Sequence, residues 1–158
     1  MAIDPHFLQY LETVHEKFLE LVNSRPIDRY SLNSDEKIPA VYLFSEGDLH
    51  LYVGRTNNLK QRLGNHCNPG SQHNQAVFAF KLARIATNNL EAIYVGDGTR
   101  KALSVEAGFA KAFSAAKLQV GKMHLRYVRV DDQLEQTLLE IYTAKVLQTP
   151  HNDFVRPR

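Results

Sequence analysis

The sequence predicts an α+β domain in which a small three-stranded antiparallel sheet is flanked by helices. Three observations predict this class: two short β-rich runs meet at a glycine-containing turn, a third β-rich run lies far downstream, and segments with a helical apolar period surround them. The length of 158 residues suits one domain with a substantial core and leaves little room for two independent domains.

The chain opens with a predicted amphipathic helix. Asp4-Pro5 is a favourable helix start because aspartate caps the first turn and proline already has the dihedral angle that this turn needs. Arg25-Pro26 predicts the end of the helix. Its apolar residues at helical spacing are Phe7, Leu11, Val14, Phe18, Leu21 and Val22. We expect residues 1–36, which end in a loop at 33–36, to precede one compact unit at 37–158.

A β-hairpin and a short helix follow. Ile38–Phe44 and Leu49–Val53 are β-rich and are separated by a turn at Gly47. Asn57 or Thr56 then caps a short helix, which Asn68-Pro69-Gly70 ends. The residues of this helix that we expect to face inward are Leu59 and Leu63.

The middle of the chain predicts a helical insertion. Residues 73–86 have helical character, a turn is expected at Gly96-Asp97-Gly98, and a second helical pattern runs through Phe109 and Phe113. The apolar contacts expected in the first of these helices are Val77, Phe78, Leu82 and Ile85. An insertion of this kind is a natural place for contacts to a substrate. Ile93-Tyr94-Val95-Gly96 nearly repeats Leu51-Tyr52-Val53-Gly54, a likeness that we attribute to chance.

A last strand and a last helix complete the prediction. Leu125–Val130 has strand character, Asp131-Asp132 caps the helix, and Thr149-Pro150 ends it. The apolar stripe expected on this helix consists of Leu134, Leu138, Ile141, Tyr142 and Val146.

Five polar residues stand at regular distances in these elements. Tyr42, Tyr52 and Arg62 follow one another at steps of ten, and Asn152 comes twelve positions after Glu140. Taken singly, each has a structural explanation: strand tyrosines usually pack, and helix glutamates and arginines are usually solvated. Their joint spacing, in this order, is what indicates a functional site.

Residues 37–153 resemble a GIY-YIG nuclease module, with Ala40-Val41-Tyr42 and Tyr52-Val53-Gly54 as its two motifs. The resemblance implies a metal-dependent endonuclease that hydrolyses DNA, with Mg²⁺ or Mn²⁺ bound by Glu140. It also implies that Arg62 stabilises the charge of the transition state, and that Asn152 supports the end of the module.

The residue that activates the water is left open. Tyr52, assisted by Tyr42, is the first choice, although a tyrosine with its ordinary pKa of about 10 would need nearby cations. His66 lies on the same helical face as Arg62 and is the other candidate for the base or for a phosphate ligand. Arg55 and Lys60 are the expected DNA-binding residues.

One departure from the family's motif concerns Ala40, which stands where the first glycine is usual. If that glycine serves only close packing, the methyl group of alanine can be accommodated. If the position needs a positive φ, alanine would be strained.

Composition and charge restrict the remaining possibilities. The net charge of +2 neither requires nor excludes DNA, and the single cysteine, Cys67, suits a reducing cytoplasm. No apolar stretch is long enough to cross a bilayer.

A homodimer could cut both strands, but no sequence feature requires one. The rival functions are a catalytically silent nucleic-acid-binding module and a protein-interaction domain that uses the first helix.

Overall fold

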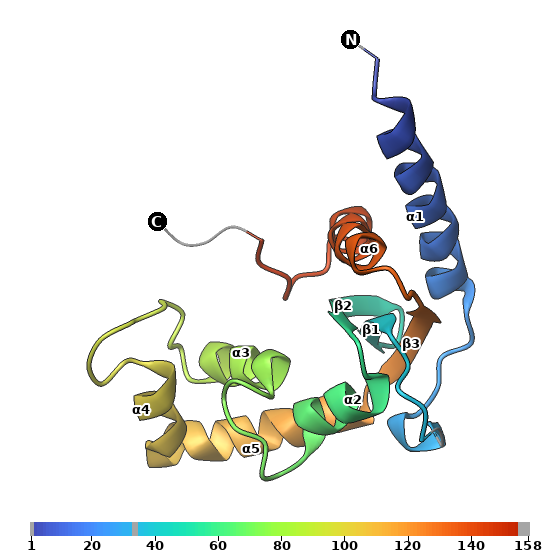
Figure 1. The fold of residues 1–158 in the computed structure, drawn as a ribbon. Helices are drawn as coiled ribbons and strands as arrows, with labels where there is room; N and C mark the ends of the chain where they lie inside the picture. The colour runs from blue at the N-terminus through green and yellow to red at the C-terminus, as the bar shows by residue number, and fades with distance from the viewer. Residues whose placement is uncertain (1, 33–34, 155–158) are drawn as a thin grey trace. The chain divides into compact units, whose positions relative to one another are not determined.

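The computed structural model describes residues 2–32 and 35–154, which form two compact units (Figure 1). The first unit contains the described residues of Met1–Lys60 and His124–Phe154, and the second contains Gln61–Met123. Of the loop expected at 33–36, residues 33 and 34 lie outside the described residues. The domain boundary expected after residue 36 stays a prediction.

The first unit is built on a three-stranded antiparallel sheet. Strands β1 (Ala40–Glu46), β2 (Leu49–Thr56) and β3 (His124–Arg129) lie in the order β2-β1-β3. The hairpin turn contains Gly47, whose φ of +56° suits glycine, and the register of β1 and β2 shifts between Phe44 and Ser45. The predicted α+β class and its antiparallel sheet are therefore confirmed.

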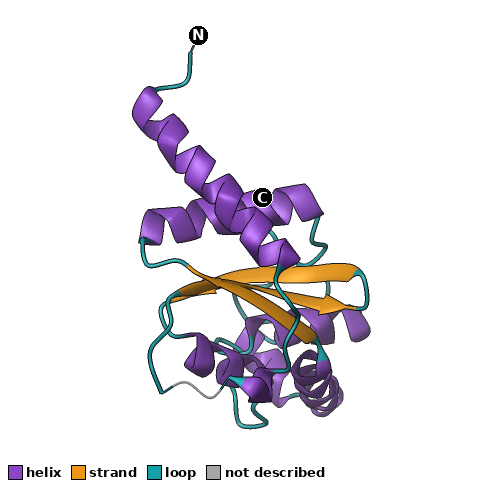
Figure 2. Cartoon of the chain, turned by 90° about the vertical axis from the view of Figure 1, so that its right-hand side faces the viewer, coloured by secondary structure: helices purple, strands orange, loops and turns teal. Residues whose placement is uncertain are grey.

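Helices α1 (Pro5–Asn23) and α6 (Gln133–Leu147) cover one face of this sheet (Figure 2). A short 3₁₀ helix at Arg29–Ser31 follows α1. Both predicted caps are present, since Asp4 accepts hydrogen bonds from the amides of His6 and Phe7, and Asp132 accepts one from Glu135. The buried core between helices and sheet consists of Val14, Phe18, Leu21, Val41, Leu43, Val53, Val128, Val130, Leu139 and Ala144.

The apolar stripe expected on α6 is partly wrong. Leu134, Ile141 and Val146 are exposed, whereas Leu138 and Tyr142 pack at the margin of the core. The buried face of α6 instead consists of Gln136, Leu139, Thr143 and Ala144. Gln136 and Thr143 are polar, so a search for apolar periodicity selects another side of the helix. Phe7, the first residue of the apolar face expected on α1, is 43% exposed.

The second unit is helical. It contains most of α2 (Leu59–Cys67), together with α3 (Val77–Ala86), α4 (Arg100–Val105) and α5 (Ala107–Lys122). The ring of Phe80 contacts those of Phe109 and Phe113, at centroid distances of 4.9 and 5.5 Å. The helical insertion is therefore confirmed. Within the described residues, no helix combines the length and the apolar content that a membrane span requires.

Two details of the insertion differ from the expectation. Helix α3 begins at Val77 and not at residue 73, because residues 68–76 form turns. Ile85 is exposed, and the inward face of α3 consists of Phe78, Ala79, Phe80 and Ala83. Alanine side chains are small and let neighbouring helices approach closely. A search for large apolar residues at helical spacing does not select them.

Candidate active site

Tyr42 lies in the centre of the sheet. It is fully buried in β1, opposite Gly54 of β2 and Tyr127 of β3. A Cβ atom added at Gly54 would lie 2.5 Å from Cζ of Tyr42, which is too close for any real contact. Glycine is therefore needed at position 54 because the tyrosine ring lies directly on its backbone. The two motifs of the sequence meet at this contact.

Tyr52 occupies the same face of the sheet as Tyr42. It pairs with Phe44, which is two residues from Tyr42, and side chains two apart in a strand point to the same face. Its neighbour Val53 belongs to the core beneath α1 and α6, so Tyr52 points to the opposite face. Tyr52 is only partly buried and is therefore the more accessible of the two tyrosines.

Glu140 and Arg55 form an ion pair. Nε of Arg55, near the end of β2, donates to Oε2 of Glu140 in the middle of α6 at 3.1 Å. The side chains are 44% and 21% exposed. Arg55 was expected to bind DNA, but in the structure its charge is directed at the carboxylate expected to hold metal. Lys60, the other expected DNA contact, is exposed and pairs with Asp35 at 3.3 Å.

Asn152 binds the outer edge of the sheet. Its Oδ1 accepts from the amide of Val53 at 2.9 Å, and its Nδ2 donates to the carbonyl of Val53 at 2.7 Å. The hydroxyl of Thr149 also donates to Oδ1, at 2.8 Å. The side-chain amide thus replaces a neighbouring strand beside β2, which lies at the sheet edge.

Arg62 and His66 belong to the second unit. Nη1 of Arg62 donates to the carbonyl of Gln75 at 3.2 Å. His66 is fully buried, and burial, aided by the charge of Arg62, lowers its pKa to about 3. Solvent does not reach this side chain in the structure, and the role of His66 as base or phosphate ligand stays a prediction. The roles that the resemblance implies for Arg62 at the transition state and for Glu140 as metal ligand require the two side chains to share one site, which stays a prediction.

Residues 39–119, just over half of the chain, match the family model described as the GIY-YIG catalytic domain. The match contains both tyrosine motifs and the arginine that follows them. The chain belongs to the GIY-YIG family. No curated protein and no solved structure matches it. The match ends before Glu140 and Asn152, so the assignment of these two residues depends on their spacing and contacts.

The departure from the GIY-YIG motif at Ala40 has a structural explanation. Ala40 is the first residue of β1 and is fully buried. Among the described non-glycine residues, positive φ angles occur at Asn88 and Gln148. The backbone at position 40 therefore does not need glycine, and the buried methyl group is accommodated by packing.

The surroundings of Glu140 fit a divalent ion held mainly by water and phosphate oxygens, as Mg²⁺ commonly is in proteins. Among the described residues, no three His, Cys, Asp or Glu side chains are grouped to hold a metal. A carboxylate has about four lone-pair sites, so the hydrogen bond from Arg55 does not by itself prevent Glu140 from binding a cation. A site that relied on protein ligands alone would not fit.

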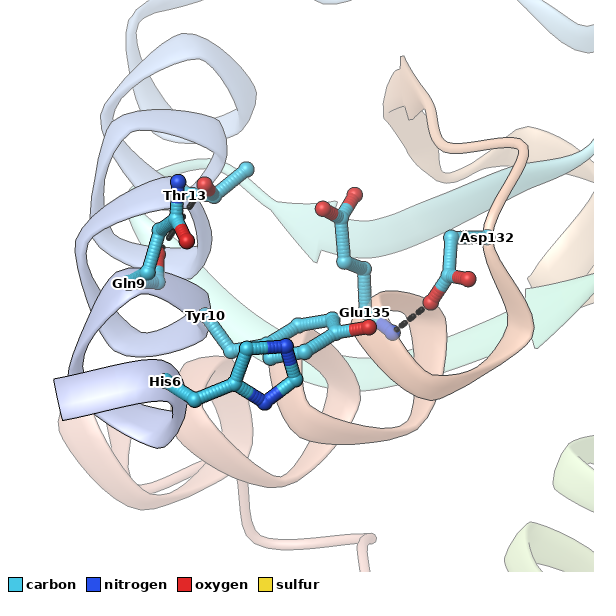
Figure 3. A pocket seen from close by; sticks show the side chains of 6 residues that line it. All are labelled: His6, Gln9, Tyr10, Thr13, Asp132 and Glu135. Carbon is cyan, nitrogen blue, oxygen red and sulfur yellow. Dashed lines mark hydrogen bonds between the residues drawn. The ribbon is translucent and has the colours of Figure 1, made fainter. Parts of the chain in front are cut away.

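A cavity of about 300 Å³ lies elsewhere in the first unit, between α1 and the start of α6 (Figure 3). His6 and Tyr10 line it from α1, and Asp132 and Glu135 line it from α6. The carboxylate of Asp132 caps α6, and both acids would repel phosphate. None of the residues that the GIY-YIG resemblance singled out lines this cavity, which is therefore not a candidate for the nuclease site.

Sequence reasoning missed the Arg55–Glu140 pair and the role of Gly54. The pair joins residues 85 positions apart, and a spacing rule that places each residue separately carries no information about their contact. The signal for Gly54 was present in the second motif, but only the structure reveals that the ring of Tyr42 covers it.

Proposed function

We propose that this GIY-YIG chain is a metal-dependent endonuclease that hydrolyses phosphodiester bonds in DNA. The observation that carries the proposal is the partly exposed carboxylate of Glu140, which Arg55 holds beside the strand of Tyr52. Membership of a nuclease family supplies the chemistry to which this carboxylate would contribute.

Glu140 would hold the ion, Mg²⁺ or Mn²⁺, on α6. The bound ion would supply a polarised phosphate and a more acidic water. Arg55 would orient the carboxylate through its hydrogen bond to Oε2, which restricts the rotamers of Glu140 before the substrate arrives. This geometry favours Arg55 as a positioning residue over Arg55 as a direct DNA contact.

Tyr52 stays the first choice for taking the proton from water, although its side chain leaves the sheet on the face opposite to the one that Arg55 and Glu140 occupy. It is more accessible than Tyr42, and Tyr42 would assist from within the sheet by fixing the hairpin against Gly54. Arg62 would stabilise the negative charge that develops on the phosphate, since its guanidinium keeps its charge and matches phosphate oxygens. Asn152 would hold β2, and with it Tyr52, in position.

The alternative is a catalytically silent nucleic-acid-binding module on the same fold. The ion pair favours this alternative in one respect, because Arg55 competes with a metal for the carboxylate of Glu140. The two functions differ in a simple assay. The purified chain is incubated with supercoiled plasmid, single-stranded DNA and RNA, in Mg²⁺, in Mn²⁺ and in EDTA. A nuclease cuts DNA only with metal, whereas a silent module binds DNA in all three buffers and cuts none.

A further inference from the structure

The two units carry opposite charges. Residues 61–123 contain eight Lys and Arg and three Asp and Glu, for a formal charge of +5. Residues 1–60 and 124–154 contain nine Lys and Arg and fourteen Asp and Glu, for a formal charge of −5. The modest charge of the whole chain therefore hides a basic helical unit, and charge distribution, more than net charge, determines where a polyanion binds.

The basic unit contains a cavity of about 570 Å³. Its polar lining comes from α4, from α5 and from the turns that precede α3, and includes His73, Lys101, Lys117, Ser71, Ser104 and Ser114. The described residues that line it include no Asp or Glu. Ammonium groups beside hydroxyl groups are a suitable lining for phosphate oxygens, which accept hydrogen bonds from both.

Neutral groups, not acids, are the partners of the buried cation at this cavity. Nζ of Lys117 donates to the carbonyls of Pro69 and Ser71, at 2.5 and 3.1 Å, and lies 4.5 Å from the ring centre of Phe113. Lys117 as a residue is only 5% exposed. Carbonyl and ring partners stabilise the ammonium group without cancelling its charge, so its field extends into the cavity.

The neighbouring cation Arg100 also has neutral partners. Arg100 donates to the carbonyl of His73 and lies over the ring of Phe80. Burial and the cations Arg100 and Lys101 lower the pKa of His73, and burial and Arg84 lower the pKa of Arg100. The buried Nδ1 of His73 has no hydrogen-bond partner among the described residues. An anion at this position would relieve the repulsion and could provide the missing partner.

We propose that this cavity binds backbone phosphates of DNA and that the insertion is the unit that holds the substrate. The proposal deepens the proposed nuclease function and rests on it. Arg55 and Lys60, which were expected to bind DNA, instead form ion pairs with acids of the first unit. A DNA-binding insertion would take over the role that was expected of them. Lys101 makes the direct phosphate contact. Lys117 holds the turn at Ser71 through its hydrogen bond and adds positive charge to the wall of the cavity.

Lys101→Ala is the test substitution, because Lys101 is exposed and its loss leaves the core of the unit intact. Lys111→Ala is the matched control, since Lys111 is an exposed lysine of the same unit that does not line the cavity. Binding of the full-length chain to a labelled DNA duplex is measured by fluorescence anisotropy in EDTA, over a range of salt concentrations. Without divalent metal the DNA is not expected to be cleaved, so the anisotropy reports binding alone.

One phosphate contact contributes about 0.9 to the slope of log affinity against log salt, which corresponds to about eightfold in affinity at 0.1 M salt. We expect Lys101→Ala to weaken binding by about that factor and to reduce the slope by about one, with a smaller change for Lys111→Ala. Equal effects of the two substitutions would overturn the cavity assignment without touching the nuclease proposal. Normal binding without cleavage in Mg²⁺ or Mn²⁺ would overturn the nuclease proposal alone.

Inorganic phosphate distinguishes a polynucleotide site from a site for small anions. The labelled duplex is competed with inorganic phosphate and with unlabelled duplex at equal phosphate concentration. We expect the unlabelled duplex to compete far better, because several contacts act together only on a polymer. Equal competition by inorganic phosphate, lost in Lys101→Ala, would identify a free-phosphate site and contradict the proposal.

Discussion

Nε of Arg55 donates to Oε2 of Glu140 at 3.1 Å and thereby joins the end of the second strand to the middle of the last helix. Arg55 follows the motif glycine directly, and Glu140 lies in a segment that the family match does not reach. The contact connects the tyrosine-bearing hairpin to the candidate metal ligand. In the proposed mechanism, it fixes the carboxylate but also competes with the metal.

Arg55→Gln is expected to lower the Mg²⁺ concentration needed for half-maximal cleavage, because it removes a cation that competes for Glu140. Partly exposed ion pairs contribute about 0.2–1 kcal/mol, so the expected shift is about 1.4-fold to fivefold. The maximal cleavage rate should fall, since the carboxylate is no longer oriented. Cleavage measured across a Mg²⁺ titration tests both effects. An unchanged Mg²⁺ requirement would show that the pair does not influence the metal site.

Gly54→Ala is expected to destabilise the fold by about 1–3 kcal/mol, because its methyl group would overlap the ring of buried Tyr42. Gly70→Ala is the matched control, since a Cβ atom there meets nothing within 4 Å. Urea unfolding measures the free energy of unfolding of both variants. If Gly54→Ala is no less stable than Gly70→Ala, the ring of Tyr42 does not lie where the structure places it.

Substitutions at Asn152 test whether its amide acts as a substitute strand. Asn152→Asp keeps the acceptor for the amide of Val53 but places a carboxylate oxygen against the carbonyl of Val53. We expect a loss of about 1–3 kcal/mol, larger for Asn152→Asp than for Asn152→Ala, whose backbone partners can bind water. The free energies of unfolding give the order of the two variants. The reverse order would contradict the two-bond arrangement.

The burial of His66 predicts a loss of stability at acid pH. Its pKa is about 3 in the folded chain and 6.5 when unperturbed, so the unfolded state binds more protons between these values. The contribution of His66 to stability is complete above pH 6.5 and is lost as the pH falls toward 3. At about pH 5 the loss amounts to about 2 kcal/mol. The lowered pKa values of His50 and His73 act in the same direction.

His66→Gln should therefore flatten the dependence of unfolding free energy on pH between neutral and mildly acidic buffers. The same substitution at exposed His124 is the control. Urea unfolding of both variants at two pH values gives the difference directly, without reference to their absolute stabilities. A slope for His66→Gln that equals that of the natural chain would mean that His66 is hydrated and can still be protonated.

The parts of the fold that sequence could predict depend on local rules. The hairpin needs a glycine at position 47 with positive φ, and the first and last helices need the acceptors Asp4 and Asp132 at their starts. These requirements act within a few residues of chain, so the sequence displays them directly.

The parts that sequence could not predict depend on contacts between distant segments. Gln136 is buried in α6 because its amide donates to the carbonyl of Val130 at 2.8 Å, and no apolar pattern announces such a residue. Arg55 was expected to bind DNA because a basic residue after the motif suits phosphate, yet the structure places Glu140 beside it. The spacing of Tyr42, Tyr52 and Arg62 identified the family but not which tyrosine solvent can reach.

Cleavage of supercoiled plasmid by Glu140→Gln tests the central claim most directly. The substitution keeps the shape of the side chain and removes the charge that would hold the metal. Glu135→Gln is the matched control on the same helix, and thermal unfolding verifies that both variants are folded. We predict that the natural chain and Glu135→Gln cut the plasmid in Mg²⁺, and that Glu140→Gln binds DNA but leaves it intact. Undiminished cleavage by folded Glu140→Gln would contradict the account.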